Sequence, residues 1–399
     1  MSTAVVVTNR LDVSSVADTA LKAAVQFWFV VSIIGQWAFL FYIVAFYGPS
    51  TLTGNFEAWR KNAFPIRSYV PGDTAGNLAF AAHALLAAVI TFGGAIQLIP
   101  QIRSRAISVH RWIGRLFMVT ALGLSVSGLY VIWTRNHGGI ARIANTTNAV
   151  LIIVFSVLAW RSALRRDLSI HRRWALRTYM ATSAQWFGRV GIFAWIVLNR
   201  GPVGLGDNFD GPVAIFWSFG CYLLPLAVLE LYLRAKESAG PGQKLAVAST
   251  LVGLTLASGV GVIGVGMAGW VPSVKAALDA RKSIAATLST AITSSGIDQA
   301  TKLYYDLKAT QPTAYNFAEK ELNTLGYDLM GARKFKEAIR IFRLNVEAYP
   351  QSSNAYASLA EAYMGYGNKA EASANCQKSL QLNPKNRRAI RVLQKLSVP

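Results

Sequence analysis

Seven long apolar segments follow one another through the first two thirds of the chain. A helix needs about 20 mostly apolar residues to cross the hydrocarbon core of a bilayer, where its backbone must satisfy its own hydrogen bonds. The pattern therefore predicts an all-α protein that begins with a seven-span transmembrane helical bundle over residues 1–271. The predicted spans are approximately 23–47, 76–99, 112–133, 140–160, 174–198, 211–233 and 245–269.

The composition changes after the last apolar segment. All 11 tryptophans lie at or before Trp270, and the residues that follow are far richer in charge. This change predicts a separate soluble domain over residues 272–399. The net charge of +21 is typical of a membrane protein whose basic loops contact membrane lipids. No motif indicates binding to nucleic acid.

The basic residues between the predicted spans indicate the orientation in the membrane. Arginine and lysine gather in the loops after the second, fourth and sixth spans, which the positive-inside rule places in the cytoplasm. The N-terminus is then cytoplasmic, and seven crossings leave the C-terminal domain in the periplasm of a bacterium. Because the start of the chain lacks the pattern of a cleaved signal peptide, we expect a multi-pass protein of the bacterial cytoplasmic (inner) membrane.

One short motif occurs twice, as SVHRWIGR at 108–115 and as SIHRRWALR at 169–177. The apolar segments before the two copies, 83–94 and 148–159, also resemble each other. The chain is therefore predicted to contain a duplicated helical hairpin, in which spans two and three match spans four and five. Arginines one turn apart at this level either contact anionic lipid headgroups or only orient the spans. These arginines are Arg111, Arg115, Arg173 and Arg177.

A second group of polar residues lies in the outer half of the predicted bundle. Arg189 is roughly 15 Å from the outer end of the fifth span, given the rise per residue of a helix. A charge at that depth normally faces a cavity or a partner, yet no acidic residue of the spans lies at the same level. The group forms either a pocket for an anionic ligand or lipid, or a purely structural network. Its members are His83, Asn145, Asn148, Gln185 and Arg189.

The four histidines fall into two predicted layers, an outer one with His83 and His137 and an inner one with His110 and His171. Two imidazoles at one depth on facing helices can hold a haem, so haem b is an alternative, although no cofactor is predicted. The other interpretation is that these histidines cap helix ends or contact headgroups. No spacing typical of metal ligands or of hydrolases occurs, and enzymatic activity is not expected. The segment GVGVIG (259–264) lies inside a predicted span, where its glycines favour close helix packing.

The C-terminal domain carries an internal repeat. Segments 319–352 and 353–386 share one pattern of large and small residues with a period of 34. This pattern resembles the tetratricopeptide repeat, a pair of helices that stacks on its neighbours. A diverged first copy is predicted over 275–312. The predicted packing positions are Leu322, Gly326, Ala338, Phe342, Pro350, Tyr356, Ala360, Ala372 and Pro384.

The order of these features over 76–198 resembles an uncharacterised bacterial membrane family, domain of unknown function 2306. The resemblance implies a multi-span bundle and no established activity. Because tetratricopeptide stacks usually bind a peptide or protein segment, the sequence predicts a membrane protein that docks a partner protein outside the cytoplasm, as a scaffold, sensor or accessory subunit. The alternatives are a cap without a partner, a haem b electron-transfer protein, and a transporter of small molecules or lipids built on the parallel repeat.

Overall fold

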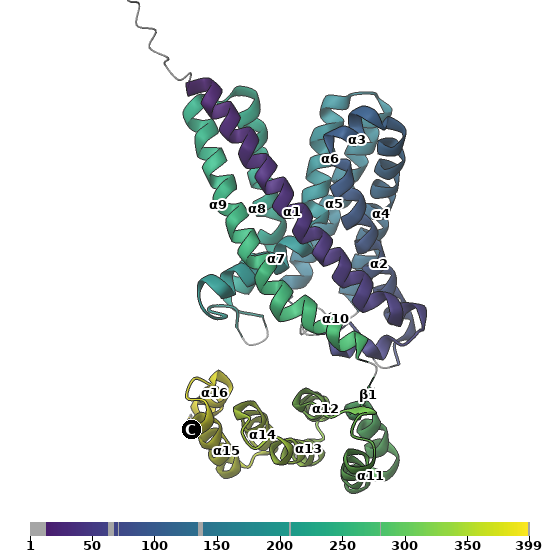
Figure 1. Ribbon diagram of the computed structural model, residues 1–399, viewed down its shortest axis with the longest axis vertical. Coiled ribbons are helices and arrows are strands. Elements are labelled where there is room, and N and C mark those ends of the chain that lie inside the picture. Colours follow the sequence, from purple (N-terminus) through teal and green to yellow (C-terminus); the bar gives the residue numbers. More distant parts are fainter. Residues whose placement is uncertain are drawn as a thin grey trace, which may run out of the picture. The chain divides into compact units, whose positions relative to one another are not determined.

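The computed structural model describes residues 13–62, 68–70, 72–134, 139–206, 209–279 and 281–397. The chain divides into two compact units, Met1–Leu278 and Asp279–Pro399. Helices make up both units apart from one short two-stranded sheet (Figure 1), which confirms the predicted all-α class.

Within the described part of the first unit, six helical segments are long and apolar enough to cross a membrane. The shorter helices are η1 (Phe56–Lys61), α3 (Pro100–Arg105), α6 (Leu168–Thr182) and α7 (Ala184–Leu198). The six segments are α1 (Val13–Leu52), α2 (Thr74–Gln97), α4 (Ile107–Thr134), α5 (Gly139–Leu164), α8 (Pro212–Ser238) and Pro241–Leu278, which comprises α9 (Pro241–Val265), η2 (Gly266–Trp270) and α10 (Val271–Leu278).

The fifth predicted span, 174–198, differs from the prediction because it is divided between α6 and α7, which meet at Ser183. Ser183 has φ −81° and ψ 1°, and its backbone N–H donates to the carbonyls of Tyr179 and Ala181 to close α6. Its own carbonyl accepts from Trp186 and Phe187 to begin α7. Each helix has 15 residues, and the six long segments alone do not reproduce the predicted count of seven spans.

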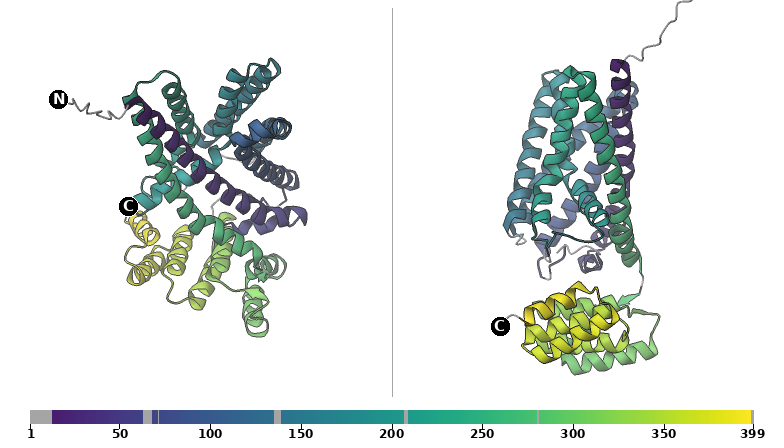
Figure 2. Two further views of the ribbon diagram at one scale, coloured as in Figure 1. Left: turned by 45° about the horizontal axis from the view of Figure 1, so that its top comes forward. Right: turned by 90° about the vertical axis from the view of Figure 1, so that its left-hand side faces the viewer.

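The long helices of the first unit expose large apolar side chains on their outer faces. Ile34 and Phe41 of α1 are 62% and 67% exposed, and Val126 of α4 is 63% exposed. Apolar surface of this extent is unfavourable in water, but it suits contact with lipid chains. The helices run alongside one another in the bundle (Figure 2).

Neighbouring helices in the sequence also pack as neighbours, in the pairs α2–α4, α4–α5 and α5–α6, while α1 packs along α9. The short helix α7 packs against α8 and α9. A Cβ atom added to Gly261 of α9 would lie 2.1 Å from the carbonyl oxygen of Val190 in α7. The two backbones are therefore in direct contact, as predicted for the GVGVIG segment.

The second unit consists of successive antiparallel helices (Figure 2). Its first helix, α11, is kinked at Gly296, whose φ of +82° favours glycine. The strands β1 and β2 pair in parallel, with Lys282 opposite Tyr315. The elements are β1 (Lys282–Ser283), α11 (Ile284–Thr310), β2 (Tyr315–Asn316), α12 (Glu319–Gly331), α13 (Phe335–Ala348), α14 (Ser353–Tyr366), α15 (Lys369–Leu382) and α16 (Arg387–Leu396).

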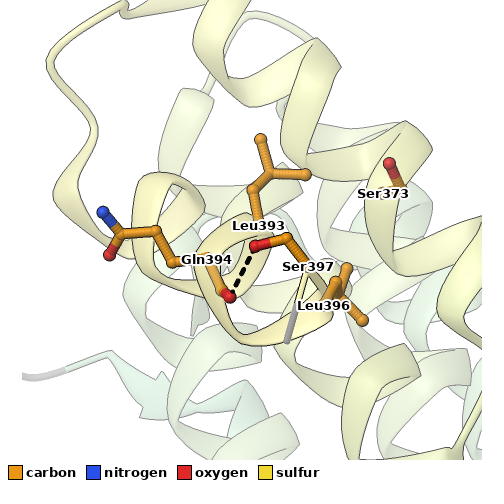
Figure 3. Close-up of a pocket in the computed structure, with 5 residues that line it drawn as sticks. All are labelled: Ser373, Leu393, Gln394, Leu396 and Ser397. Atoms are coloured by element: carbon orange, nitrogen blue, oxygen red, sulfur yellow. Dashed lines mark hydrogen bonds between the residues drawn. The ribbon is translucent and has the colours of Figure 1, made fainter. Parts of the chain in front are cut away.

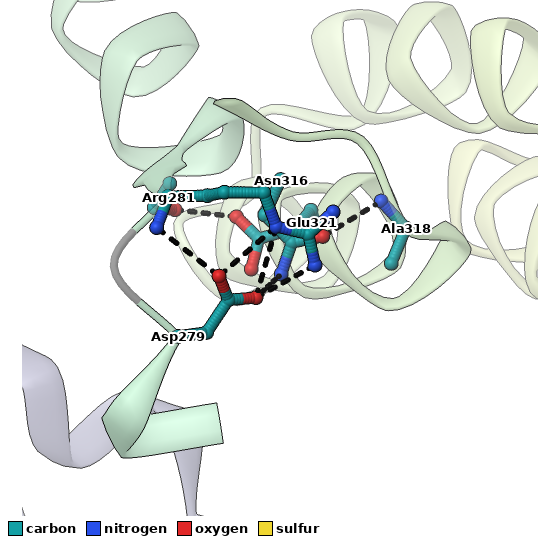
Figure 4. A network of polar contacts seen from close by, with 6 residues as sticks. Asp279, Arg281, Asn316, Ala318 and Glu321 are labelled. Atoms are coloured by element: carbon teal, nitrogen blue, oxygen red, sulfur yellow. Dashed lines mark hydrogen bonds and ion pairs between the residues drawn. The ribbon is translucent and has the colours of Figure 1, made fainter. Parts of the chain in front are cut away.

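The division between the units lies after Leu278, later than the change in composition at residue 272 indicates. The reason is that α10 continues from the last membrane segment and packs against α1 and η1. At the other side of the division, Asp279 accepts hydrogen bonds from Arg281 Nη2 at 2.7 Å and from Asn316 Nδ2 at 3.4 Å (Figure 4). Asn316 Oδ1 accepts in turn from the N–H of Ala318 at 3.0 Å. This network holds the two strands at the start of the second unit.

The second unit has a hydrophobic core made only of its own residues, from Ile284 to Val392. Most predicted packing positions contribute to it, whereas Tyr356 is half-buried and Pro350 and Pro384 are exposed after helix ends. The positions without solvent exposure are Leu322, Ala338, Phe342, Ala360 and Ala372. Gly326 lets α12 approach α13, because a Cβ atom there would lie 2.4 Å from Phe342 Cζ.

This contact predicts opposite effects of alanine at two glycines of α12. Gly326→Ala drives a methyl group into the Phe342 ring, and overpacking of this kind costs about 1–3 kcal/mol. At Gly331 no atom lies within 4 Å of an added Cβ, so Gly331→Ala is expected to be neutral or to stabilise by up to about 1 kcal/mol. Urea unfolding of residues 279–397 measures both, and equal stabilities of the two variants would contradict the packing.

Candidate functional site

The break between α6 and α7 is held by a buried polar cluster. Gln36 of α1 is only 2% exposed. Its Oε1 accepts from the Tyr179 hydroxyl at 3.0 Å, and its Nε2 donates to Ser183 Oγ at 3.3 Å. Asn148 of α5 donates from Nδ2 to the carbonyl of Ala181 at 3.3 Å. An interrupted helix in an apolar environment needs such side chains, because it releases backbone groups that lipid cannot satisfy.

Arg189 lies on α7, just beyond the break. Its Nη1 donates to the Gln185 carbonyl at 2.8 Å and to Gln185 Oε1 at 3.0 Å. Its Cζ lies 5.2 Å from the centre of the Phe39 ring on α1, within the range of a cation–π interaction. Its Nε is buried and has no hydrogen-bond partner among the residues that the structure describes. Among the described residues no carboxylate forms an ion pair with Arg189.

The structure brings three of the predicted pocket residues into one chain of hydrogen bonds. Gln185 Nε2 donates to Asn145 Oδ1 at 3.4 Å, which links α7 to α5 and continues the contact of Arg189 with Gln185. His83 of α2 lies outside this chain of hydrogen bonds, and its Nδ1 is 3.1 Å from Ser127 Oγ of α4. Asn148 instead supports the helix break.

Sequence analysis missed a second polar cluster beside these residues. Asn62 Nδ2 donates to the hydroxyls of Tyr42 at 3.0 Å and Tyr47 at 2.8 Å, and Asn62 Oδ1 accepts from Ser273 Oγ at 3.2 Å. The cluster joins α1 and α10 to the residue that follows η1. Hydroxyls inside apolar segments are the signal, but the contact between Asn62 and Ser273 spans 211 positions and is not visible in any local pattern.

The two inner histidines occupy equivalent places, because each is the fourth residue of its helix, α4 or α6. His171 Nδ1 lies 2.9 Å from the carbonyl oxygen of Ala159. His110 Nδ1 is buried and has no hydrogen-bond partner in the part of the chain that the structure describes. His137, the proposed outer partner of His83, lies outside the described residues.

The four motif arginines have different surroundings in the two copies. Arg111 and Arg115 are exposed, and Arg115 lies against the ring of Trp112. Arg173 forms an ion pair with Glu237 of α8. Arg177 forms two hydrogen bonds with Glu230 of α8, at 2.7 and 3.0 Å. The second pair therefore links α6 to α8, a contact that sequence analysis did not predict.

Polar side chains also connect the alternate helices α12, α14 and α16 of the second unit. The Tyr327 hydroxyl donates to Glu361 Oε2 at 2.5 Å and accepts from Arg388 Nη1 at 3.2 Å. Arg388 Nη1 also donates to Asn354 Oδ1 at 3.3 Å. Burial raises the pKa of Tyr327, so its hydroxyl keeps its proton. Asn323 Oδ1 of α12 is buried without a hydrogen-bond partner.

A shallow recess lies elsewhere on the second unit, beside α15 and α16 (Figure 3). None of its lining residues is charged, and Ser397 Oγ donates to the carbonyl of Gln394 at 2.8 Å instead of pointing to a free acceptor. The recess is therefore a weaker candidate than the polar face of α12, α14 and α16. Its lining residues are Ser373, Leu393, Gln394, Leu396 and Ser397.

The long apolar helices and their apolar outer faces define a multi-helix integral membrane protein. Residues 80–232, from α2 into α8, match the family described as "Predicted membrane protein (DUF2306)". This match confirms the resemblance predicted from the duplicated motif, over a longer stretch of chain. No curated protein matches the sequence.

The ion pair between Arg177 and Glu230 predicts coupled effects on stability. Its side chains are only 16% and 36% exposed, so Arg177→Leu or Glu230→Leu alone should destabilise by roughly 1.5–3 kcal/mol, because each leaves a partly buried charge unpaired. The double variant should lose less than the sum of the two. Thermal unfolding of the full chain in detergent measures this double-mutant cycle.

The pair of Arg173 with Glu237 is the matched control. Its side chains are 42% and 51% exposed, and exposed pairs contribute little. Its cycle should therefore show almost no coupling. Purely additive losses at Arg177 and Glu230 would contradict the assigned role of their pair.

Proposed function

We propose that the protein is a membrane-anchored docking protein, a scaffold, sensor or accessory subunit, whose second unit is a tetratricopeptide domain that binds a segment of a partner protein. The period of 34 residues and the buried positions Leu322, Ala338 and Phe342 support this class of domain. In tetratricopeptide stacks the first helices of successive repeats line the concave binding face. In this chain those helices are α12 and α14, and α16 continues their row after the last repeat.

The observation that carries the proposal is the polar network across those three helices. Tyr327 and Glu361 come from the repeats 319–352 and 353–386, Arg388 comes from the helix that follows them, and the Tyr327 hydroxyl is hydrogen-bonded to both other side chains. Such bonds fix side chains that would otherwise lose rotamer freedom on binding, so the face is organised in advance for a ligand. The free Oδ1 of Asn323 on the same helix as Tyr327 adds an unused acceptor for a backbone N–H.

The orientation in the membrane supports a partner outside the cytoplasm. We count α6 and α7 together as one interrupted crossing, which gives the seven predicted crossings. Basic residues such as Arg103, Arg165 and Lys236 lie near helix ends that this path places on one side. By the positive-inside rule that side is cytoplasmic, and the second unit is then periplasmic in the inner membrane of a bacterium.

Site-specific photocrosslinking in cells tests the docking proposal. A photoreactive phenylalanine analogue at Thr324 of α12, on the proposed binding face, should give a discrete crosslinked partner. The same analogue at Lys336 of α13 is the matched control and should not. Arg388→Ala, which removes hydrogen bonds to Tyr327 and Asn354, should weaken the crosslink from Thr324. Equal crosslinking from both positions, or none from Thr324, would rule out this face.

Haem b binding in electron transfer is a second candidate, favoured by the inner histidines. A neutral imidazole near a carbonyl oxygen donates from Nδ1, so the contact of His171 with Ala159 leaves its Nε2 lone pair free for iron. His110, at the equivalent position of α4, has a buried ring nitrogen with no partner among the described residues. Arg103 and Arg111 are available at the same end of the bundle for propionates. A haem held there would supply one-electron redox chemistry.

An absorption spectrum of the purified chain tests this candidate. With haem present, a Soret band appears and sharpens on reduction with dithionite. His171→Ala should remove it, whereas replacement of the distant His83 should leave the inner site intact. Absence of a Soret band after expression with added haem precursor would exclude the candidate, and it would leave the docking proposal untouched.

A further inference from the structure

We infer that α4 holds the headgroup of an anionic phospholipid, such as phosphatidylglycerol, on Arg111 and Arg115 beside Trp112. The second copy of the same motif, on α6, has no such role, because its arginines are already paired with carboxylates of the chain. The site lies on the outer face of the first unit. It does not depend on the docking function of the second unit.

The second copy of the motif shows how its arginine binds an anion. On α6 the Cζ atom of Arg177 lies 4.5 Å from the centre of the Trp174 ring. Its Nε and Nη2 atoms donate to the carboxylate of Glu230 on α8, at 2.7 and 3.0 Å. The chain thus contains an arginine fork that rests on an indole ring and is completed by an oxyanion.

The first copy contains the same contact between arginine and indole without the carboxylate. The Cζ atom of Arg115 lies 5.3 Å from the centre of the Trp112 ring. Arg111 precedes Arg115 by one turn on the same face of α4. Neither arginine forms an ion pair with a residue that the structure describes, and the first turn of α4 has no acidic residue. The anion that completes this copy therefore comes from outside the chain.

The apolar surface beside the two arginines indicates the source of that anion. Trp112 is 69% exposed, and Leu116 and Val119 are exposed at successive turns of the same face of α4. In a membrane protein such a face is in contact with lipid chains. A phospholipid covers the apolar face and the arginines together, whereas a free anion covers only the arginines.

The length of α4 places the arginines at the level of the lipid headgroups. Its 28 residues span about 42 Å at the rise of an α-helix, close to the thickness of a bilayer with its headgroup layers. Helical side chains point toward the N-terminus of their helix. The contact of Arg115 with Trp112, three residues earlier, has this direction. The guanidinium is therefore directed to the end of α4, where lipid phosphates lie and tryptophan is common.

The uncompensated charges of Arg111 and Arg115 favour a headgroup with a net negative charge. Phosphatidylglycerol brings one phosphate and no cation, whereas phosphatidylethanolamine also brings an ammonium group that the arginines repel. Each basic residue near an anionic lipid surface contributes a factor of about five in affinity. Two such residues on one face therefore select between these two lipids.

Fluorescence quenching by brominated lipids in reconstituted vesicles tests the inference. The full chain carries a bimane label at Val119→Cys, one turn beyond Arg115, and the native Cys221 and Cys376 are buried. The vesicles contain phosphatidylcholine with either dibrominated phosphatidylglycerol or dibrominated phosphatidylethanolamine. We expect phosphatidylglycerol to bind beside the label at least about tenfold more tightly. Arg115→Gln should lower this preference about fivefold, and its combination with Arg111→Gln should abolish it.

Two controls separate this site from a general attraction to anionic lipid. A label at Ile34→Cys, another exposed apolar position, on α1, should report no preference. Arg173→Gln removes an equal charge from the second copy, where Glu237 already pairs with it, and should leave the preference at the Val119→Cys label unchanged.

Three results of the quenching experiment would overturn the proposal. The first is equal quenching by the two lipids at the Val119→Cys label, and the second is a preference that survives the double substitution. The third is a loss of preference in inorganic phosphate but not in chloride of equal ionic strength, since it would assign the arginines to a free anion. Both arginines are exposed, so their replacement by glutamine leaves the packing of the bundle intact.

Discussion

The hydrogen bonds of Gln36 across the break between α6 and α7 organise the rest of the bundle. A helix that stops and restarts inside an apolar layer exposes carbonyls and N–H groups that lipid cannot satisfy. Here Gln36 binds Tyr179 before the break and Ser183 at the break, while Asn148 occupies the released carbonyl of Ala181. The cost of the break is therefore offset by side chains of two other helices, α1 and α5, and α7 can take a direction that a continuous helix would not have.

The direction of α7 determines what surrounds Arg189. Because α7 packs against α8 and α9 and contacts α9 through Gly261, its other side is turned to α1, where Phe39 receives the guanidinium. Two arginines of this bundle differ in how their positive charges are compensated. Arg177, before the break, is neutralised by Glu230, whereas Arg189, after it, contacts Gln185 and the Phe39 ring and has no ion pair within the described ranges. The contrast separates an arginine that is neutralised within the bundle from one that has no ion-pair partner among the described residues.

The sequence predicted those parts of the molecule that depend on local patterns. Apolar length located the long helices, and the i,i+4 spacing of Gln185 and Arg189 placed them on one face. The period of 34 residues located the positions, such as Gly326 and Phe342, where paired helices touch. The break was missed because Ser183 is neither proline nor glycine, the residues that usually mark an interrupted helix. Gln36, which stabilises the break, lies 143 positions before Tyr179 and 147 before Ser183. A contact over this sequence distance cannot be predicted from a local pattern.

The two copies of the His-Arg-Trp motif illustrate how one local sequence acquires different roles from its neighbours. His110 and His171 begin their helices at the same position, as a duplicated hairpin predicts. The second copy packs against α8. There Glu230 and Glu237, two turns apart, form ion pairs with Arg177 and Arg173. No ion pair is found for Arg111 or Arg115 among the described residues, and both stay exposed. The tertiary partner, and not the motif itself, therefore decides that one copy fixes a helix contact while the arginines of the other stay exposed.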